Sequence, residues 1–475
     1  MDRTTPEATE DLATRFFDAM EREGLGSIQF KSTRTLVNAF AGLEDFDLLI
    51  PPHQFEAALR IAEGLGFRRR RTTDPLHPAP VVDLLAWDTG TSRLHHLSLH
   101  RTLVFGERPV KRHVVPWNRI EVLATAEHRP GLHVLPAAAE LTLLVARVLL
   151  RTSRPSRLRH PWRRVAVPVD TRMRAELADL DPLVQDDDLF AMTAHLLPGA
   201  EDVILRSRRR LCVDAASSPD DARTNESDRR NLLRSLRPLA TRSRLSGWLL
   251  EVRRRHRPVR HIGQGTVVAI VGADGAGKST VTQAVVGRLG TKLTVDRAYL
   301  GLPRDDRTVA RLTMLAAVAR RMRLKRLELT LAALRPIVVA RLRRKRIRRA
   351  WDDASRGIIT VTDRFPLREF DAVEPPMDGP RLTGPGTLAR YERRIYAALP
   401  QEPDLIVALV GDAALLAARK PGDEEPTVLA EKADAVRRLA ASRPDVLAVD
   451  AAAPLNTVVD RVITAVWNRI DAQPG

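Results

Sequence analysis

The most informative segment of the chain reads Gly272-Ala273-Asp274-Gly275-Ala276-Gly277-Lys278-Ser279-Thr280. It satisfies the pattern G-x-x-x-x-G-K-[ST] and lies between an apolar run at 266–271 and an amphipathic segment at 281–289 that Gly290 closes. Glycines let a backbone wrap closely around phosphate oxygens, and the amides of such a loop converge at the positive end of the following helix. The segment therefore predicts a phosphate-binding loop.

Side chains of this loop have predicted roles as well. Lys278 is expected to reach the β- and γ-phosphates of ATP, and the Ser279 hydroxyl is expected to take a coordination position on Mg²⁺. ATP and Mg²⁺ are thus the predicted cofactors. The residues predicted to bind the nucleotide are Gly272, Asp274, Gly275, Ala276, Gly277, Lys278, Ser279 and Thr280.

Apolar runs alternate with helical segments from Gly265 onward. Strands are predicted at 266–271, 358–362, 405–410 and 446–449, and a terminal helix at 454–470. This alternation is typical of a parallel α/β sheet, and roughly 210 residues suffice for one nucleotide-binding domain. The predicted fold class is α/β, with a P-loop domain at 263–475.

This part of the sequence resembles the thymidylate kinases and related nucleoside monophosphate kinases. The resemblance covers about residues 263–475 and rests on four short elements. They are Asp274 and Gly275 in the loop, Asp363-Arg364-Phe365 after a predicted strand, Pro403-Asp404 before the next strand, and Ala418-Arg419-Lys420 beyond it. It implies an enzyme that transfers the γ-phosphoryl group of ATP to a nucleoside monophosphate.

The resemblance also implies roles for individual residues. Asp363 and Arg364 match the DR[FY] pair of the family, which places Arg364 beside the reacting phosphates, and Arg419 matches the start of the mobile lid over ATP. Phosphoryl transfer needs cations around the migrating group, and a lid arginine neutralises charge and excludes water. The alternatives are a structural ion pair between Arg364 and Asp363 and a solvated surface position for Arg419. The predicted catalytic residues are Lys278, Asp363, Arg364 and Arg419.

The sequence leaves the phosphate acceptor open. Thymidylate kinases usually follow DR[FY] with a serine and an aromatic-glutamine element that engage the base, whereas 366–370 here read Pro-Leu-Arg-Glu-Phe and precede an unusual segment at 371–385. The acceptor is therefore a nucleotide, a sugar or another phosphate acceptor. The alternative function is an ATP-binding regulatory module, associated with a membrane or nucleic acid, whose kinase chemistry is degenerate.

Residues 1–150 have the mixed pattern of an α+β domain. Helices are predicted at 11–23 and after Pro51-Pro52, and extended segments at 27–31, 45–50, 81–86 and 94–100. Asp45 and Asp47 stand at i and i+2, so they share one face of a strand. Two such carboxylates can hold a pair of Mg²⁺ ions, and Asp83 could offer a third ligand.

The segment 25–105 resembles minimal nucleotidyltransferases, with their D-x-D element at Asp45 and Asp47. The resemblance implies nucleotidyl transfer with these two aspartates as metal ligands. Lys31-Ser32 stands where the family usually has Gly-Ser, and a lysine side chain would crowd the approach of a triphosphate to the backbone. A retained, non-catalytic fold is therefore the alternative. His96, Ser98 and His100 alternate on a predicted strand face, and no metal is assigned to them.

Two further segments are helical and rich in arginine. Residues 151–262 are predicted to form a helical connector with a mobile loop at 215–228, which is rich in Ser, Asp and Asn. Residues 304–351 are predicted to form a solvated helical hairpin that covers the kinase core. Contact of this basic hairpin with anionic lipid or an acidic acceptor is the alternative. Its apolar stripe consists of Leu312, Leu315, Val318, Met322, Leu329, Leu331 and Leu334.

At roughly 150 residues per domain, a chain of 475 residues should hold about three compact units, or two with a substantial connecting region. Its hydrophobic fraction of 44% indicates a globular chain. Cys212, the single cysteine, cannot form an intramolecular disulfide, and neither a signal peptide nor an apolar run of membrane-spanning length is visible. We therefore expect a cytoplasmic protein. The net charge of +18 could suggest polyanionic partners, but all except eight of the 77 basic residues are arginine, a bias typical of GC-rich coding. Nucleic acid is not predicted as a partner, and peripheral membrane contact stays open.

Overall fold

The protein is known from a computed structural model, and its contacts divide the chain into two compact units, Met1–Pro258 and Val259–Gly475. The structure describes residues 11–74, 77–78, 80–106, 111, 113–123, 126–151, 169, 171–217, 226–241, 258–301, 306–370, 377, 379–382, 384–399, 401–422 and 424–471. The finer division at 150 and 262 stays a prediction.

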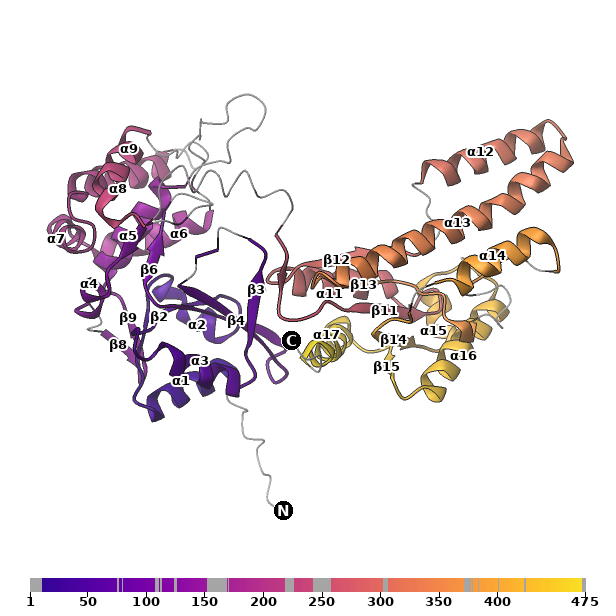
Figure 1. Ribbon diagram of the computed structural model, residues 1–475, viewed down its shortest axis with the longest axis horizontal. Coiled ribbons are helices and arrows are strands. Elements are labelled where there is room, and N and C mark those ends of the chain that lie inside the picture. Colours follow the sequence, from indigo (N-terminus) through magenta and orange to yellow (C-terminus); the bar gives the residue numbers. More distant parts are fainter. Residues whose placement is uncertain are drawn as a thin grey trace, which may run out of the picture. The chain divides into compact units, whose positions relative to one another are not determined.

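The C-terminal unit is built on a five-stranded sheet in the order β12-β13-β11-β14-β15, and its neighbouring strands are all parallel (Figure 1). Parallel sheets carry crossover helices on their faces, so the central strands of this sheet are buried. The sheet comprises β11 (Val267–Gly272), β12 (Val295–Ala298), β13 (Ile359–Thr362), β14 (Leu405–Val410) and β15 (Val446–Asp450), and a short strand, β10 (Arg260–His261), precedes it.

Two groups of helices cover this sheet. One group is α11 and α17, which pack against each other, and the other includes α13 and α16, whose Ile347 and Val436 join Val271 and Ala408 in one core. The helices are α11 (Lys278–Gly290), α12 (Arg307–Arg321), α13 (Lys325–Ala354), α14 (Thr387–Ala397), α15 (Ala413–Arg419), α16 (Pro426–Ser442) and α17 (Leu455–Asp471), with the 3₁₀ turn η4 (Arg368–Phe370).

The four strands predicted for this unit are confirmed, with ends that shift by at most one residue. The predicted terminal helix is confirmed as α17. Sequence analysis missed β12, whose residues Val-Asp-Arg-Ala lie at the sheet edge and are only partly buried. An edge strand lacks the continuous apolar run that marks a central parallel strand.

The N-terminal unit contains a mixed sheet in which β3, β4, β5, β2, β1, β9 and β8 follow one another. The strands are β1 (Ser27–Gln29), β2 (Phe46–Leu49), β3 (Arg68–Thr72), β4 (Val81–Asp88), β5 (Arg93–His100), β8 (Ala126–Arg129) and β9 (Leu132–Val134). A separate hairpin pairs β6 (Leu103–Phe105) with β7 (His113–Val115). The helices near the sheet are α1 (Leu12–Arg22), α2 (Leu36–Phe40) and α3 (Phe55–Gly64), with η1 (Thr33–Thr35). Phe17 of α1 lies edge-on to Phe46 of β2, so aromatic packing fixes this helix on the sheet.

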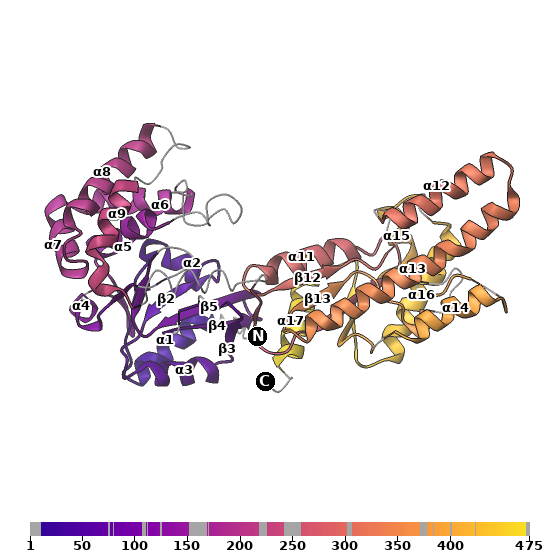
Figure 2. The same cartoon turned by 45° about the horizontal axis from the view of Figure 1, so that its top comes forward.

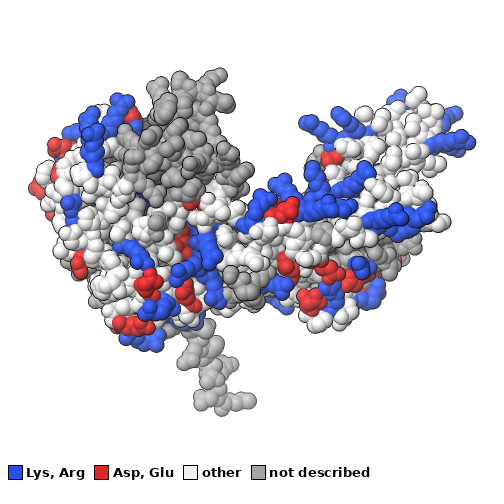
Figure 3. All heavy atoms as spheres, viewed as in Figure 1, with Lys and Arg blue, Asp and Glu red and all other residues white. Residues whose placement is uncertain are grey.

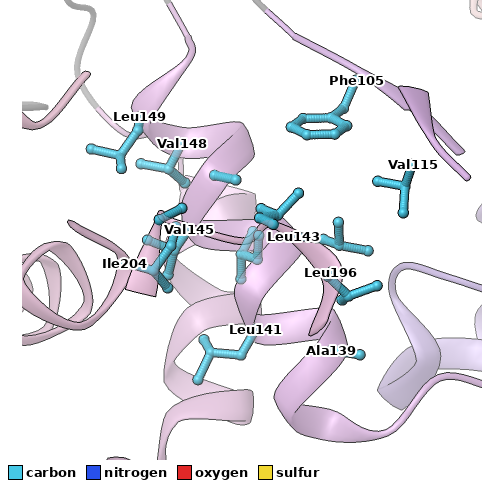
Figure 4. Close-up of a cluster of buried hydrophobic side chains, with 14 of the residues drawn as sticks. Phe105, Val115, Ala139, Leu141, Leu143, Val145, Val148, Leu149, Leu196 and Ile204 are labelled. Atoms are coloured by element: carbon cyan, nitrogen blue, oxygen red, sulfur yellow. The ribbon is translucent and has the colours of Figure 1, made fainter. Parts of the chain in front are cut away.

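The rest of this unit is a helical bundle around α5 (Ala137–Leu149). Most side chains of α5 are buried, as expected for a helix that is apolar on all sides, and Figure 4 shows Leu143 and Val145 among side chains from neighbouring elements. The neighbours are α4 (Trp117–Glu121), α6 (Thr171–Leu180), η2 (Asp181–Leu183), α7 (Asp186–Leu196), α8 (Glu201–Ser217), α9 (Glu226–Ser235) and η3 (Arg237–Leu239).

The mobile loop predicted at 215–228 is wrong at both ends. α8 continues to Ser217, and α9 already begins at Glu226, while 218–225 lie outside the described residues. Asp228 is buried and accepts a hydrogen bond from Arg210 Nη1 at 2.7 Å. Glu226 and Asp228 stand in the first turn of α9, where the helix dipole favours negative charge.

Candidate functional site

The glycine-rich loop joins the central strand β11 to α11. Gly275 and Gly277 both have a φ of +86°, a left-handed conformation that side chains disfavour. A Cβ atom on Gly275 would lie 2.5 Å from the carbonyl oxygen of Leu416 in α15. The loop therefore needs glycine at 275 for two reasons, backbone conformation and close packing on a second helix.

Lys278 begins α11 and its side chain turns back along the loop. The residue is only 7% exposed, and Nζ donates to the carbonyl oxygens of Gly272 at 2.9 Å and Ala273 at 2.8 Å. The same ammonium group lies 3.4 Å from Asp274 Oδ1. The ammonium is thus held at the mouth of the loop, beside the helix N-terminus that favours anions.

Asp274 is the centre of a cluster of cations from three parts of the fold. Arg364, which follows β13, donates from Nη2 to Asp274 Oδ1 at 2.9 Å, and Lys432 Nζ of α16 lies 3.8 Å from Oδ2. Burial would raise the pKa of Asp274, but Lys278, Arg364 and Lys432 outweigh it and lower the pKa from 3.8 to about 2. The carboxylate is ionised at neutral pH and holds three positive groups at one edge of the sheet.

Sequence analysis missed Lys432. The residue is 8% exposed and pairs with Glu424, which precedes α16. The signal was present, because Lys432 lies at helical spacing between Leu429 and Val436 on the buried stripe of α16. A lysine on an apolar stripe is rare unless it is paired.

Asp363 and Arg364 are adjacent but their side chains have different contacts. Asp363 is 1% exposed, accepts from the Leu300 amide at 3.3 Å and lies 3.6 Å from Arg297 Nη2. Arg364 contacts Asp274 instead, so it belongs to the loop cluster. The pairing of β13 with β11 places Arg364 near the loop, whereas Asp363 contacts Arg297 of β12.

Arg419 is the last residue of α15, and the structure does not bring it to Asp274. Its Nη1 donates to the carbonyl oxygen of Ala451 at 2.8 Å, and the residue is exposed. Ser279 and Thr280 are exposed in the first turn of α11. The roles of these residues stay predictions.

The N-terminal aspartates also meet across the sheet. The register of β2, β5 and β4 places Asp47, Ser98 and Asp83 in one row. Ser98 Oγ donates to Asp83 at 2.9 Å, His96 Nε2 lies 3.2 Å from Asp83, and His96 Nδ1 lies 3.0 Å from Asp45. The tertiary structure therefore brings the three predicted carboxylates to one surface.

Basic groups already neutralise these carboxylates. Lys31 Nζ lies 2.6 Å from Asp47, and Arg70 pairs with Asp83. Burial would raise the pKa of Asp47, yet Lys31 and His100 hold that pKa well below its usual range, and His96 and Arg70 do the same for Asp83. Within the described part of the chain, no three His, Cys, Asp or Glu side chains are grouped to hold a metal ion. A metal ion here would have to displace Lys31 from Asp47, and Asp45 and Asp47 as metal ligands stay a prediction.

The loop, the parallel sheet and the clustered cations define a P-loop protein of the α/β class. No family model matches the sequence. Over 220 residues the chain is 30% identical to the uncharacterized ATP-binding protein YghR of Escherichia coli strain K12, a match that covers 42% of this chain and 86% of YghR. The uncharacterized ATP-binding protein YghS of the same strain is 27% identical over 220 residues, which cover 92% of YghS. The chain belongs to the family of YghR.

Solved structures give a weaker likeness. Deoxyadenosine kinase from M. mycoides with bound dATP is 13% identical, with a TM-score of 0.27, and the match covers 42% of this chain and 98% of the kinase. A second structure of that kinase, with products bound, is 16% identical with a TM-score of 0.29.

Proposed function

We propose that the C-terminal unit binds ATP with Mg²⁺ and transfers the γ-phosphoryl group to an acceptor, as a kinase related to the nucleoside monophosphate kinases. The observation that carries the proposal is the convergence of Lys278, Arg364 and Lys432 on Asp274 beside the loop. Phosphoryl transfer is catalysed mainly by positioning and by cations around the migrating group. The names of YghR and YghS, which describe ATP-binding proteins, support the nucleotide.

In the proposed reaction, the bond between the γ-phosphorus of ATP and the β–γ bridging oxygen breaks, and ADP leaves with that oxygen. A bond between the γ-phosphorus and an acceptor oxygen forms. Lys278 and Arg364 stabilise the negative charge on the migrating group, and Ser279 would hold the Mg²⁺ that shields the phosphates. A phosphate acceptor is already ionised at neutral pH, and a hydroxyl acceptor releases its proton to solvent as the new bond forms. The ionised carboxylate of Asp274, whose pKa is lowered to about 2 by Lys278, Arg364 and Lys432, keeps these three cations together.

The acceptor remains a phosphate-bearing nucleotide, a sugar or a related molecule. A screen of purified full-length protein with Mg-ATP and a panel of acceptors, read by the mass of the product, tests the proposal. Lys278→Ala should abolish product formation, whereas Lys345→Ala, a matched change of an exposed lysine on α13, should leave it intact. Phosphoryl transfer that survives Lys278→Ala would contradict the kinase proposal.

For the N-terminal unit, we propose a nucleotidyltransferase-like fold that is retained without paired-metal catalysis. The ion pair between Lys31 and Asp47 favours this alternative, because the Lys31 ammonium lies where a metal ion bound to the Asp47 carboxylate would lie. Radiolabelled NTP should not be transferred by the wild-type protein. Transfer that is lost in both Asp45→Asn and Asp47→Asn would instead support a catalytic metal site.

A further inference from the structure

The helical hairpin formed by α12 and α13 ends in an unusual surface. α12 and the N-terminal half of α13 extend beyond the sheet of the C-terminal unit in both ribbon views (Figures 1 and 2). The two helices pack against each other and are joined by a turn at Arg323, whose φ is +59°. We call residues 311–329 the hairpin tip.

The tip concentrates exposed apolar side chains. Of the 16 large hydrophobic residues that are exposed in the described parts of the chain, seven lie between 314 and 329. Clusters of this kind mark interaction sites, since soluble proteins rarely expose contiguous apolar patches. The seven residues, with exposures from 46% to 70%, are Met314, Leu315, Val318, Met322, Leu324, Leu327 and Leu329.

This exposure corrects one expectation from the sequence. The hairpin at 304–351 was expected to cover the kinase core, but Leu315, Val318 and Met322 of its stripe are exposed, as is Leu329. Leu334 of the same stripe is partly buried and packs near Ile337 and Ile395. Only the C-terminal half of α13 covers the core, with buried residues such as Ile347. Apart from the packing of α12 on α13, the described residues of this unit leave the apolar side chains of the tip exposed.

The tip is also strongly basic. It contains six basic residues against the single acidic residue Glu328, so its net charge is +5. Glu328 lies 3.9 Å from Arg320, which leaves the excess positive charge at the surface. Figure 3 shows basic and uncharged side chains next to each other along this hairpin. The six basic residues, all exposed, are Arg311, Arg320, Arg321, Arg323, Lys325 and Arg326.

We propose that the hairpin tip docks on an anionic lipid bilayer. Acyl chains accept the leucine and methionine side chains at the depth of the headgroup boundary, while lipid phosphates bind the surrounding arginines. A second copy of the chain fits this surface less well, because two tips of charge +5 repel each other. The docking is peripheral, since no described helix has the length and apolar character needed to cross a membrane. The tip thereby holds the proposed kinase at the surface of the membrane.

The test measures binding of the full-length protein to vesicles by flotation. Vesicles of phosphatidylcholine with about one third phosphatidylglycerol should bind the protein at least tenfold more tightly than pure phosphatidylcholine, and added salt should weaken the binding. Leu324→Gln with Leu327→Gln should reduce binding about tenfold, and so should Arg323→Glu with Arg326→Glu. All four side chains are exposed, so the variants should fold and bind ATP normally.

Matched controls change the same chemistry elsewhere. Arg15→Glu with Arg22→Glu reverses two exposed charges on α1, and Leu388→Gln with Leu455→Gln removes two exposed leucines outside the tip. Both controls should bind vesicles like the wild type. Equal binding to the two kinds of vesicle, or equal losses in tip and control variants, would overturn the proposal. Dimerisation in ultracentrifugation that the tip variants abolish, without any lipid binding, would identify a second copy as the partner and also overturn it.

Discussion

Replacing Gly275 by alanine would place a methyl group 2.5 Å from the carbonyl oxygen of Leu416 in α15, and 3.1 Å from the carbonyl carbon. Both atoms belong to backbone, which cannot rotate away as a flexible side chain would. The substituted residue must also keep the left-handed φ of +86°. The structure therefore separates two costs at this position, one from the backbone conformation and one from the contact with α15.

Gly277 provides a matched comparison. It has the same φ of +86°, but a Cβ atom there would meet no other atom within 4 Å. Gly277→Ala should lower the free energy of unfolding only by the cost of the left-handed conformation, about 1–2 kcal/mol. Gly275→Ala should lower the free energy of unfolding by the same conformational cost and by a further overpacking cost of about 1–3 kcal/mol, because α15 has to shift.

Scanning calorimetry of the full-length variants measures this difference as a shift in the transition of the C-terminal unit. For a domain of this size, 1 kcal/mol corresponds to a shift of about 2–4 °C. Gly275→Ala should therefore melt several degrees below Gly277→Ala. If both variants melt at the same temperature, the packing of the loop on α15 does not contribute as the structure indicates. Unaltered melting of both would refute the argument from backbone conformation too.

Three further predictions concern charged side chains. Lys432→Met should weaken ATP binding, measured by calorimetry, about tenfold or more, because a hydrogen bond to a charged group is lost and Glu424 is left without its cation. The control variant Lys345→Ala should bind ATP like the wild type. Unchanged ATP affinity in Lys432→Met would show that Lys432 does not belong to the site. Asp274 has a pKa of about 2 in the folded protein, below its ordinary value of 3.8, so its ionised carboxylate stabilises the fold above about pH 4 and this contribution is lost as the pH falls towards 2. Asp274→Asn should therefore have a lower free energy of unfolding at neutral pH and a weaker dependence of that free energy on acid pH. The same pH dependence of stability in variant and wild type would contradict this. Lys31→Ala removes the cation 2.6 Å from Asp47, so the pKa of Asp47 should rise. Mn²⁺ binding, measured by electron paramagnetic resonance, should then be tighter in the variant than in the wild type. Tight Mn²⁺ binding by the wild type would show that Lys31 does not block the site.

Local sequence predicted the elements that depend on neighbouring residues. The run before Gly272 is apolar at every position, so its burial as a parallel strand could be foreseen, and β11 forms there. The glycine spacing and Lys278 likewise indicated the loop and the start of α11, because a phosphate loop is defined within nine consecutive residues. The Asp45-Phe46-Asp47 alternation similarly located β2.

Other features depended on residues far apart in the chain. No local pattern indicated that Lys31 would pair with Asp47, or that Arg70 and His96 would surround Asp83. The amphipathic spacing of the hairpin tip predicted a helix correctly but not its environment, because periodicity shows which residues share a face and not what lies opposite. The hairpin was expected to cover the core, but Leu315, Val318, Met322 and Leu329 of its stripe are exposed, whereas Leu334 packs against a buried cluster.

By itself, the sequence determined a parallel α/β unit with a phosphate loop, since strand burial and glycine spacing are local properties of the chain. Only the tertiary structure decided which charges surround that loop. Arg364 arrives through the pairing of β13 with β11, and Lys432 through the packing of α16, so the site exists only once sheet order and helix packing bring these distant residues to Asp274.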